Sequence, residues 1–421
     1  MRIAIIGSGI AGLSAAYYLA NDHQITLFEA DDRLGGHTNT VPVIVDGTTY
    51  RVDTGFIVHN AKNYPLFCEF LRELGVATQD ADMSFSVSHQ RPFLEFSGTG
   101  LRGLFAQPKN IFSLPFWRLL VSIGRFGRLG VKTLRLAGDE GSEETVEQFL
   151  ERHSFSKTFR DQYLIPLGSS IWSADPRTFL DFPVQALLHF FNNHGLLTFM
   201  KRPQWRTVVG GSSTYIDALL GALSLDIRLE SKVVSVQRSP DRVTLTTASG
   251  VEEFDTLICA THSDQALALL SDPTAEETSV LEAIRFQANQ AVLHTDRSML
   301  PALRHAWAAW NYYCPDTTAE LPTLTYWMNR LQRLDAPKEI CITLNRSAEI
   351  DPSTVLGVYD YSHPIYDHGT FAAQRRWPEI NGTNNTWFVG AWWGYGFHED
   401  GMRSARRVAD AISEMQKVSN S

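Results

Sequence analysis

The first thirty residues contain two short apolar runs separated by a segment with helical spacing. Ile3–Ile6 and the run that ends before Glu29 are continuous and apolar, which is typical of buried strands. Residues 10–20 are rich in alanine and leucine, and glycines stand where the first run meets them. The pattern predicts strand, helix and strand in that order, which is a βαβ unit at the start of the chain.

Beyond this unit, the pattern predicts a hairpin, a long helical region and several later strands. The hairpin lies within 41–60 and turns at Asp46-Gly47. Helical spacing dominates 64–74 and much of 110–225, with predicted breaks at Pro166, Pro176, Pro183 and Pro203. Strands are predicted at 232–236, 243–247 and 254–260, which form a meander, at 291–295, 324–328, 340–344 and 386–390, and a last helix at 401–415.

The length and the distribution of these elements predict a divided α/β fold. A chain of 421 residues with 44% hydrophobic composition forms about two or three domains. We expect a discontinuous, Rossmann-like nucleotide-binding domain built from 1–80, 205–285 and 380–421. An α+β substrate-binding domain, from 81–204 and 286–379, is inserted into it.

Three glycines, Gly7, Gly9 and Gly12, form a G-x-G-x-x-G pattern at the first strand–helix junction. In such a motif the first glycine permits the turn, the second lets the backbone approach a pyrophosphate, and the third permits close packing of helix on strand. Glu29 follows at the spacing expected for an acid that binds a ribose hydroxyl. The combination predicts a dinucleotide site.

A second match to the same pattern, Gly98–Gly103, lacks this context. It follows a polar, interrupted stretch, runs into Pro108, and has Arg118 where an acid is expected. We interpret it as a loop.

The charge of the chain is −9 and is unevenly distributed. A net negative charge argues against general binding to nucleic acid. From Phe96 to Gly138 there is no acidic residue, whereas seven basic residues occur there: Arg102, Lys109, Arg118, Arg125, Arg128, Lys132 and Arg135. The last five share one face of the predicted helix. Residues 100–138 are therefore either a helical segment that faces an anionic membrane or an ordinary half-buried surface helix.

No apolar run is long enough to span a bilayer, and Arg2 leads directly into the first strand. Four separated cysteines, without metal-type spacing, fit a reducing compartment. We expect a cytoplasmic protein, on the inner face of a membrane if the basic segment docks there, with no bound metal.

Several segments resemble the flavin-containing amine oxidase superfamily, which includes protoporphyrinogen oxidases and carotenoid desaturases. They are Glu29–Thr38 with its paired glycines, Asp53–Phe56, Val233-Val234, and Gly390–Met402 before the last helix. The resemblance covers the whole chain and implies an FAD-binding domain of the glutathione-reductase type. It makes FAD the expected cofactor rather than NAD. No cysteine follows Cys341, so we expect non-covalent binding.

The resemblance implies a set of residues that contact FAD. His37 stands where the superfamily usually has a basic residue. In the terminal motif, the start of the last helix is expected to direct N–H groups at the flavin. The implied contact residues are Gly7, Gly9, Ile10, Ala11, Gly12, Glu29, Ala30, Gly35, Gly36, His37, Thr38, Thr54, Gly55, Phe56, Val234, Gly390, Asp400 and Met402.

More narrowly, WRTVVGGSSTYIDAL, TYWMNRLQ and GYGFHEDG are similar to a bacterial subgroup of predicted FAD-binding oxidoreductases. Genes of this subgroup often neighbour cyclopropane fatty acyl phospholipid synthases, and relatives are linked to oxidation of modified acyl chains, including furan fatty acid formation. The resemblance implies an apolar or lipid substrate and a lipid-modifying methyltransferase as a partner.

Phe397 and His398 are the candidates for catalysis. His398 either acts as a base or proton shuttle or hydrogen-bonds to backbone or flavin. Glu399 and Asp400 either cap the last helix or contact the cofactor. Residues 286–292 lack the lysine that amine oxidases place near flavin N5. Trp172, Trp310, Tyr312 and Tyr313 either line a substrate cavity or belong to the core.

Three functions remain open at this stage. The first is an FAD-dependent oxidase or desaturase that transfers a hydride from a fatty-acyl phospholipid to flavin N5, with oxygen or another compound as the final acceptor. The second is a flavin amine oxidase, against which the missing lysine counts. The third is a non-catalytic flavin-binding partner of a lipid-modifying enzyme.

Overall fold

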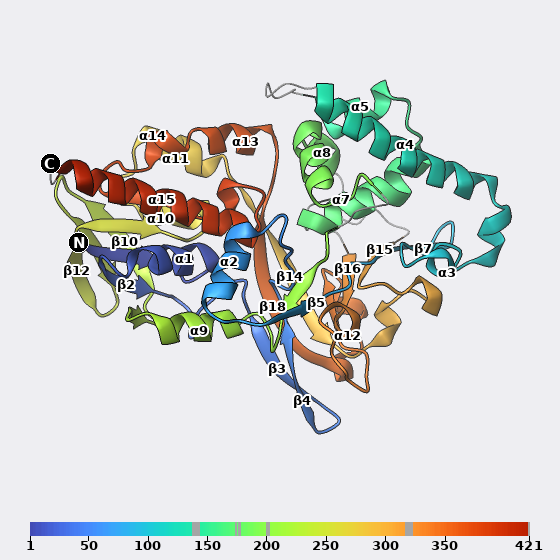
Figure 1. Ribbon diagram of the computed structural model, residues 1–421, viewed down its shortest axis with the longest axis horizontal. Coiled ribbons are helices and arrows are strands. Elements are labelled where there is room, and N and C mark those ends of the chain that lie inside the picture. The colour runs from blue at the N-terminus through green and yellow to red at the C-terminus, as the bar shows by residue number, and fades with distance from the viewer. Residues whose placement is uncertain (137–143, 173–174, 176–177, 199–202, 316–322, 420–421) are drawn as a thin grey trace.

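The computed structural model describes the chain except for residues 137–143, 173–174, 176–177, 199–202, 316–322 and 420–421. Figure 1 shows two bodies side by side along the long axis. One body holds both ends of the chain, and the other holds helices α4, α5, α7 and α8. Within the described residues, no helix combines the length and the apolar character needed to cross a bilayer.

A five-stranded parallel sheet forms the centre of the first body. Its order is β19-β13-β1-β2-β9, and every neighbouring pair is parallel. The predicted βαβ unit is confirmed as β1, α1 and β2. The strands are β1 (Arg2–Ile6), β2 (Gln24–Phe28), β9 (Asp226–Arg228), β13 (Thr256–Cys259) and β19 (Thr386–Phe388).

Four helices share a core with one face of this sheet. Helix α15 packs along α1, so the last helix of the chain covers the first one. It begins at His398, three residues earlier than predicted, which places Glu399 and Asp400 inside its first turn. The helices are α1 (Ile10–Leu19), α2 (Pro65–Glu73), α9 (Thr214–Ala222) and α15 (His398–Ser419).

A three-stranded antiparallel sheet and four helices share a core with the other face. The meander was predicted to end in a strand over 254–260, and this was wrong. Its third strand is β12, and after Asp255 the chain crosses into the parallel sheet as β13. The elements are β10 (Val233–Arg238), β11 (Val243–Thr247), β12 (Gly250–Phe254), α10 (Ser263–Leu269), α11 (Ala275–Glu282), α13 (His368–Arg375) and α14 (Trp377–Ile380).

The second body contains a seven-stranded sheet in the order β18-β14-β17-β16-β15-β6-β7. All its pairs are antiparallel except β6 with β15, which joins segments more than 200 residues apart. The strands are β6 (Phe85–His89), β7 (Leu94–Ser97), β14 (Phe286–His294), β15 (Trp310–Cys314), β16 (Thr323–Trp327), β17 (Cys341–Leu344) and β18 (Val355–Pro364), and the short helix α12 (Met328–Leu331) follows β16.

Two antiparallel strand pairs lie in the middle of the molecule in Figure 1. Strands β3 (Thr40–Val45) and β4 (Thr48–Asp53) form the predicted hairpin, and Asp46 and Gly47 both have positive φ, as its tight turn requires. Its valines pack in the core of the seven-stranded sheet. Strands β5 (Thr78–Asp80) and β8 (Arg206–Val208) pair nearby. The predicted domain boundaries themselves stay a prediction.

The long helical region lies on the second body and forms its own core. Pro166 was predicted to break a helix, which was wrong, because it occupies the second position of α7 after a π-helical turn at Arg160–Leu164. Pro183 does precede a helix start, and Pro176 lies outside the described residues. The helices are α3 (Leu101–Leu104), α4 (Leu114–Leu136), α5 (Val146–Arg152), α6 (Lys157–Phe159), α7 (Ile165–Trp172) and α8 (Val184–Asn193). Residues 98–103 form a turn and the start of α3, not a second βαβ unit.

Candidate functional site

The predicted cofactor residues gather at the carboxyl ends of the parallel strands. Gly7 follows β1 with φ of +99°, and Gly9 stands at the N-cap of α1 without a side-chain cap. A methyl group on Gly12 would lie 1.9 Å from the carbonyl oxygen of Gly7, so only glycine permits this contact between helix and turn. The first-turn N–H groups of Ile10, Ala11 and Gly12 therefore face the space before the helix.

Glu29 directly follows β2 and lies beside the glycine turn. Its carboxylate accepts hydrogen bonds from the backbone N–H groups of Ser8 at 2.9 Å, Ala30 at 2.7 Å and Asp31 at 3.0 Å, and from the Ser8 hydroxyl. These bonds hold the carboxylate at the mouth of the turn. That is where an acid must lie to bind a ribose hydroxyl.

The paired glycines and the Thr54–Phe56 segment meet next to this turn. The amide of Gly35 donates to the carbonyl of Ser8, and the Phe56 amide donates to the carbonyl of His37 at 2.8 Å. A methyl group on Gly55 would lie 2.2 Å from the carbonyl oxygen of His37. Gly36 and Thr38 lie on the same turn, so both predicted segments contribute backbone to one site.

A positive charge that the sequence analysis missed lies at the paired glycines. The guanidinium of Arg33 donates to the carbonyl oxygens of Gly36 at 2.9 Å and Thr38 at 3.4 Å. His37 is buried, and burial with the neighbouring His363 and His262 lowers its pKa to about 3. His37, which replaces the usual basic residue, is therefore neutral. The positive charge at this turn is that of Arg33, four residues earlier in the chain.

The C-terminal motif reaches the same place. Gly390 follows β19, and its amide donates to the Ser404 hydroxyl at 2.9 Å. The side chain of Met402 is fully buried in the core shared with α1, so only its backbone can face a ligand. Gly401 lies against Ile10 and Ala11, which brings the starts of α15 and α1 together.

The two carboxylates of this motif are held by backbone amides. Glu399 accepts from the amides of Leu66 at 3.2 Å and Phe67 at 3.1 Å, in the first turn of α2. Asp400 accepts from the amides of Tyr395 at 3.0 Å and Phe397 at 3.1 Å. Glu399 thus caps a different helix from its own, and Asp400 fixes the turn before α15.

His398 is buried beside the glycine turn. Its Nε2 lies 2.9 Å from the Thr38 hydroxyl and 3.4 Å from the Tyr215 hydroxyl, and its ring stacks on Phe56 at 3.5 Å between ring centres. Burial lowers its pKa well below the ordinary value. The geometry makes His398 a neutral anchor between α15 and the paired-glycine segment, and its catalytic role stays a prediction.

Val234 lies at the far, adenosine-side end of the site. The amide of Ser231 donates to the carbonyl of Glu29 at 2.8 Å, which places the start of β10 beside the end of β2. A bulge between Val233 and Ser235 takes Val234 out of the ladder with β11. Its backbone is therefore available there, as the prediction requires, while its side chain is exposed.

A cluster of neutral polar side chains, which the sequence analysis did not identify, lies beside His37. The ring centre of His363 lies 5.4 Å from that of His37, and that of His262 lies 6.3 Å away. The amide of Asn289, on the strand that lacks the lysine, lies 3.0 Å from His363 Nδ1. Burial lowers the pKa of His363 to about 4. The strand positions that carry these residues are distant in sequence, so no local pattern could have revealed the cluster.

Asp53 is a structural hub rather than a ligand group. Its carboxylate accepts from the Thr40 hydroxyl at 2.6 Å, the Ser212 amide at 2.8 Å and the Gln332 side chain at 3.0 Å. It is fully buried, and burial raises its pKa to about 6. These bonds tie the hairpin to both bodies next to Thr54.

On the other side of the terminal motif stand seven aromatic side chains that we call the aromatic wall. Phe190 of α8 lies 5.2 Å from Phe397 and 4.7 Å from Trp172 between ring centres, and Tyr395 lies 5.9 Å from Phe371. The hydroxyl of Tyr366 is buried without a partner in the described part of the chain. The members of the wall are Trp172, Phe182, Phe190, Tyr366, Phe371, Tyr395 and Phe397.

Of the four aromatic residues predicted to line a cavity or belong to the core, only Trp172 joins this wall. Tyr312 is buried in the core of the seven-stranded sheet, and Trp310 packs against Tyr326 there. Tyr313 is on the same strand and lies under the guanidinium of Arg346. These three belong to the packing of the sheet.

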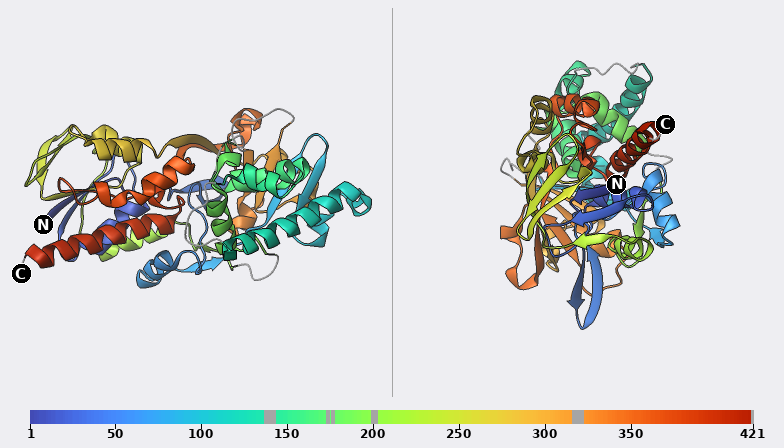
Figure 2. Two further views of the ribbon diagram at one scale, coloured as in Figure 1. Left: turned by 90° about the horizontal axis from the view of Figure 1, so that it is seen from above. Right: turned by 90° about the vertical axis from the view of Figure 1, so that its left-hand side faces the viewer.

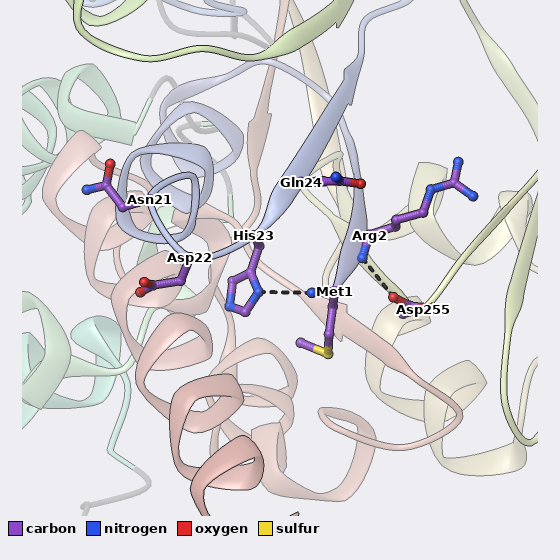
Figure 3. Close-up of a pocket in the computed structure, with 7 residues that line it drawn as sticks. All are labelled: Met1, Arg2, Asn21, Asp22, His23, Gln24 and Asp255. Atoms are coloured by element: carbon purple, nitrogen blue, oxygen red, sulfur yellow. Dashed lines mark hydrogen bonds between the residues drawn. The ribbon is translucent and has the colours of Figure 1, made fainter. Parts of the chain in front are cut away.

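A surface depression lies at the opposite end of the parallel sheet (Figure 3). It is formed by Met1, Arg2 and residues 21–24 with Asp255, where the Arg2 amide donates to the Asp255 carboxylate at 2.7 Å. Parallel α/β sheets bind ligands at the carboxyl ends of their strands. This depression is at the amino ends of β1 and β2, so we assign it no function.

The residues present fit an FAD. No atom of the described residues lies within 4 Å of the position that a methyl group on Gly9 would take, although the turn and helix around it are buried. That open position lies next to uncapped helical N–H groups, which suit a pyrophosphate. The carboxylate of Glu29 lies where it could accept a hydrogen bond from the ribose. The paired glycines, Arg33 and the start of α15 continue the site toward Phe397.

Comparison with known proteins agrees with this geometry. Prenylcysteine oxidase 1 of Pongo abelii is 30% identical over 240 residues, which are 53% of this chain and 41% of that protein. The chain therefore spans less than half the length of this relative. Cyclohexylamine oxidase from Brevibacterium oxydans IH-35A has 16% identity and a TM-score of 0.70, with 99% of each chain covered. A CLA-producing fatty acid isomerase from P. acnes has 17% identity and a TM-score of 0.66, with 98% of each covered.

The two solved structures share the fold. Residues 10–413 match the model of the family described as flavin containing amine oxidoreductase. The chain is accordingly a flavin-dependent oxidoreductase that uses FAD, and it belongs to the flavin-containing amine oxidoreductase family.

Proposed function

We propose that this enzyme is an oxidase or desaturase whose substrate is apolar and is a fatty-acyl phospholipid. The aromatic wall is the observation that carries the proposal. It lies beside the start of α15 and carries rings rather than charged groups, and three of its members, Phe371, Tyr395 and Phe397, are only partly buried. Such a surface favours an alkyl chain over a charged amine.

The ionisable groups near the wall support the same substrate class. Glu399 and Asp400 point into backbone amides, so neither carboxylate is directed at a substrate ammonium. Burial lowers the pKa of His363 to about 4 and that of His194, which stacks on Phe190, to about 4. These imidazoles are neutral at neutral pH and place no cation beside an alkyl chain.

The chain's own residues have separable tasks in this reaction. The turn around Gly9 and the carboxylate of Glu29 would hold the adenosine half of the cofactor, and the start of α15 would direct N–H groups at its flavin end. The aromatic wall excludes water and holds the acyl chain. FAD, when bound, would supply the hydride-accepting group and the means to deliver the electrons to oxygen or another acceptor.

The names of one relative and one structural neighbour also support the proposal. One is named a prenylcysteine oxidase and the other a fatty acid isomerase. Each name refers to a compound that carries an apolar chain. The isomerase shares only the fold at 17% identity, so it shows that this architecture accommodates such a chain in another protein.

Mass spectrometry of lipids tests the proposal. Purified holoprotein is incubated aerobically with a total bacterial lipid extract, and the acyl composition is compared with that of a Gly9→Ala sample, in which we expect FAD binding to be strongly weakened. We expect phospholipid species lighter by two hydrogen atoms, or their oxidised descendants, with the wild type alone. Unchanged lipids together with conversion of added primary amines would identify an amine oxidase and refute the lipid substrate. Unchanged lipids and amines would instead favour a non-catalytic partner.

A further inference from the structure

We infer that the surface made by α3, the 3₁₀ turn Pro108–Phe112 and the start of α4 docks on a bilayer with anionic headgroups. We call this surface, residues 101–121, the docking tip. It lies at the end of the molecule opposite the two chain ends, as Figure 1 and the left view of Figure 2 show. This inference does not depend on the identity of the substrate.

The docking tip exposes large apolar side chains that a soluble surface normally buries. Phe112 is 90% exposed, Leu101 76%, Val121 64% and Leu114 61%. Ile111 and Trp117 are exposed as well. Scattered single exposures are ordinary, but six within about twenty residues form one patch, which marks an interaction site.

The patch is a built structure rather than a loose loop. The Trp117 indole N–H donates to the carbonyl of Ile111 at 2.8 Å, and its ring lies 5.7 Å from Phe105 at the end of α3. The amide of Ser113 donates to Asn110, which closes the 3₁₀ turn before α4. These contacts hold the turn that carries Phe112 and the helix start that carries Leu114.

The charges around the patch match an anionic lipid surface. Arg102, Lys109 and Arg118 are exposed on the tip, and no acidic residue occurs between Phe96 and Gly138. Apolar and aromatic side chains that enter the headgroup region, surrounded by cations, are the composition of an interfacial anchor. A second copy of the chain fits poorly, because two tips would bring six cations together.

The docking tip differs from the basic helix face that the sequence analysis proposed for membrane contact. Arg125 was grouped with the exposed cations of the helix, but it donates to the carbonyl of His153 and lies over the ring of Phe155. The middle of α4 is used for packing, since Phe126 contacts Phe149, Phe159 and Phe191. Docking therefore involves the first two turns of α4 and the turn before it.

A chain of packing contacts joins the docking tip to the aromatic wall. Helix α4 runs from the tip to α8, where Phe126 contacts Phe191, and the neighbouring Phe190 contacts Phe397. The buried side chains of the tip, Phe116 and Leu119, belong to the same core as α8 and the wall. A bilayer bound at the tip thus lies at one end of the body that carries the wall.

Co-sedimentation with vesicles tests the inference. Holoprotein is mixed with vesicles of phosphatidylcholine alone or with phosphatidylglycerol added, at low and high salt. The variants are Phe112→Ser with Leu114→Ser, and Arg102→Gln with Lys109→Gln. Val251→Ser is the control, because Val251 is 63% exposed on β12 in the other body. Flavin absorbance and circular dichroism check that each variant is folded.

We expect wild type and Val251→Ser to bind the anionic vesicles and to be released by high salt. The apolar variant should bind roughly tenfold or more weakly. The basic variant should lose roughly fivefold per charge, on anionic vesicles only. Absence of wild type from the anionic pellet at low salt overturns the inference and points to a protein partner for the patch. Equal binding by the apolar variant and wild type also overturns it.

Discussion

Glu399 is predicted to stabilise α2 and not to bind FAD, and the variant Glu399→Gln separates these roles. Helix α2 has Pro65 at its first position, and its N-cap residue Tyr64 makes no capping bond through its side chain. The orphan amides of Leu66 and Phe67 are instead satisfied by the two carboxylate oxygens of Glu399, which is 3% exposed. A glutamine keeps one acceptor and turns an NH₂ group toward the other amide.

The magnitude follows from these contacts. One buried N–H left without a partner costs about 1–3 kcal/mol. Loss of a carboxylate charge at a helix N-terminus costs a further 0.3–1 kcal/mol or so. Relief from burying a charge offsets part of this, so we expect the free energy for opening α2 to fall by about 2 kcal/mol. That is roughly a thirtyfold faster amide exchange.

Hydrogen exchange by mass spectrometry over residues 65–74 measures the effect, together with FAD affinity from fluorescence titration. The control is Glu414→Gln, the same substitution at an exposed position on the same helix. We expect faster exchange in α2 for Glu399→Gln alone and FAD affinity within about threefold of wild type. Unchanged exchange with a large loss of FAD affinity would refute the capping role and make Glu399 a cofactor ligand.

Three further predictions address the cofactor site, the aromatic wall and pH. Gly9→Ala should leave apoprotein stability unchanged and weaken FAD binding strongly, whereas Gly12→Ala should lower both stability and FAD affinity, because only the methyl group at position 12 meets protein atoms. FAD titration and thermal unfolding of the apoprotein distinguish the two variants, and equal apoprotein stabilities would contradict the prediction. Phe190→Gln should lower kcat/KM for apolar substrates at least tenfold while flavin content stays normal, since a polar amide replaces the ring that contacts Phe397; an unchanged kcat/KM would remove Phe190 from the substrate site. The pKa of Asp53 is raised to about 6, so the unfolded chain loses this proton first and stability falls as the pH rises from about 4 to 6, by roughly 3 kcal/mol. Asp53→Asn should remove that decline. Urea unfolding of both proteins is measured at several pH values, and the difference between them cancels the opposite contribution of the buried histidines. Identical slopes of unfolding free energy against pH would show that the reasoning is wrong.

The parts of the site that sequence could predict are those formed by contiguous residues. Gly7 to Glu29 lie within one βαβ unit, where the chemistry of each residue depends on neighbours a few positions away. The role of Glu399 could not be predicted, because it depends on α2 meeting α15 across more than 300 residues. The same holds for His363 beside His37, and for the pairing of β6 with β15.

Amphipathic spacing also has a limit that α4 illustrates. The spacing of its arginines correctly indicates a helix, but it does not tell which turns are covered. Phe155 and His153 cover Arg125, whereas Phe112 is 90% exposed in the part of the chain that the structure describes. Exposure depends on the neighbouring helices, so the candidate docking surface appears only in three dimensions.

Anaerobic reduction of the bound flavin tests the central claim most directly. Oxidised holoprotein is mixed under anaerobic conditions with vesicles of phospholipids that carry modified acyl chains, or with primary amines at matched concentration, and flavin absorbance is followed in time. The proposed function predicts bleaching by the phospholipids and a stable oxidised spectrum with the amines. Bleaching by an amine while the phospholipids leave the spectrum unchanged would contradict it.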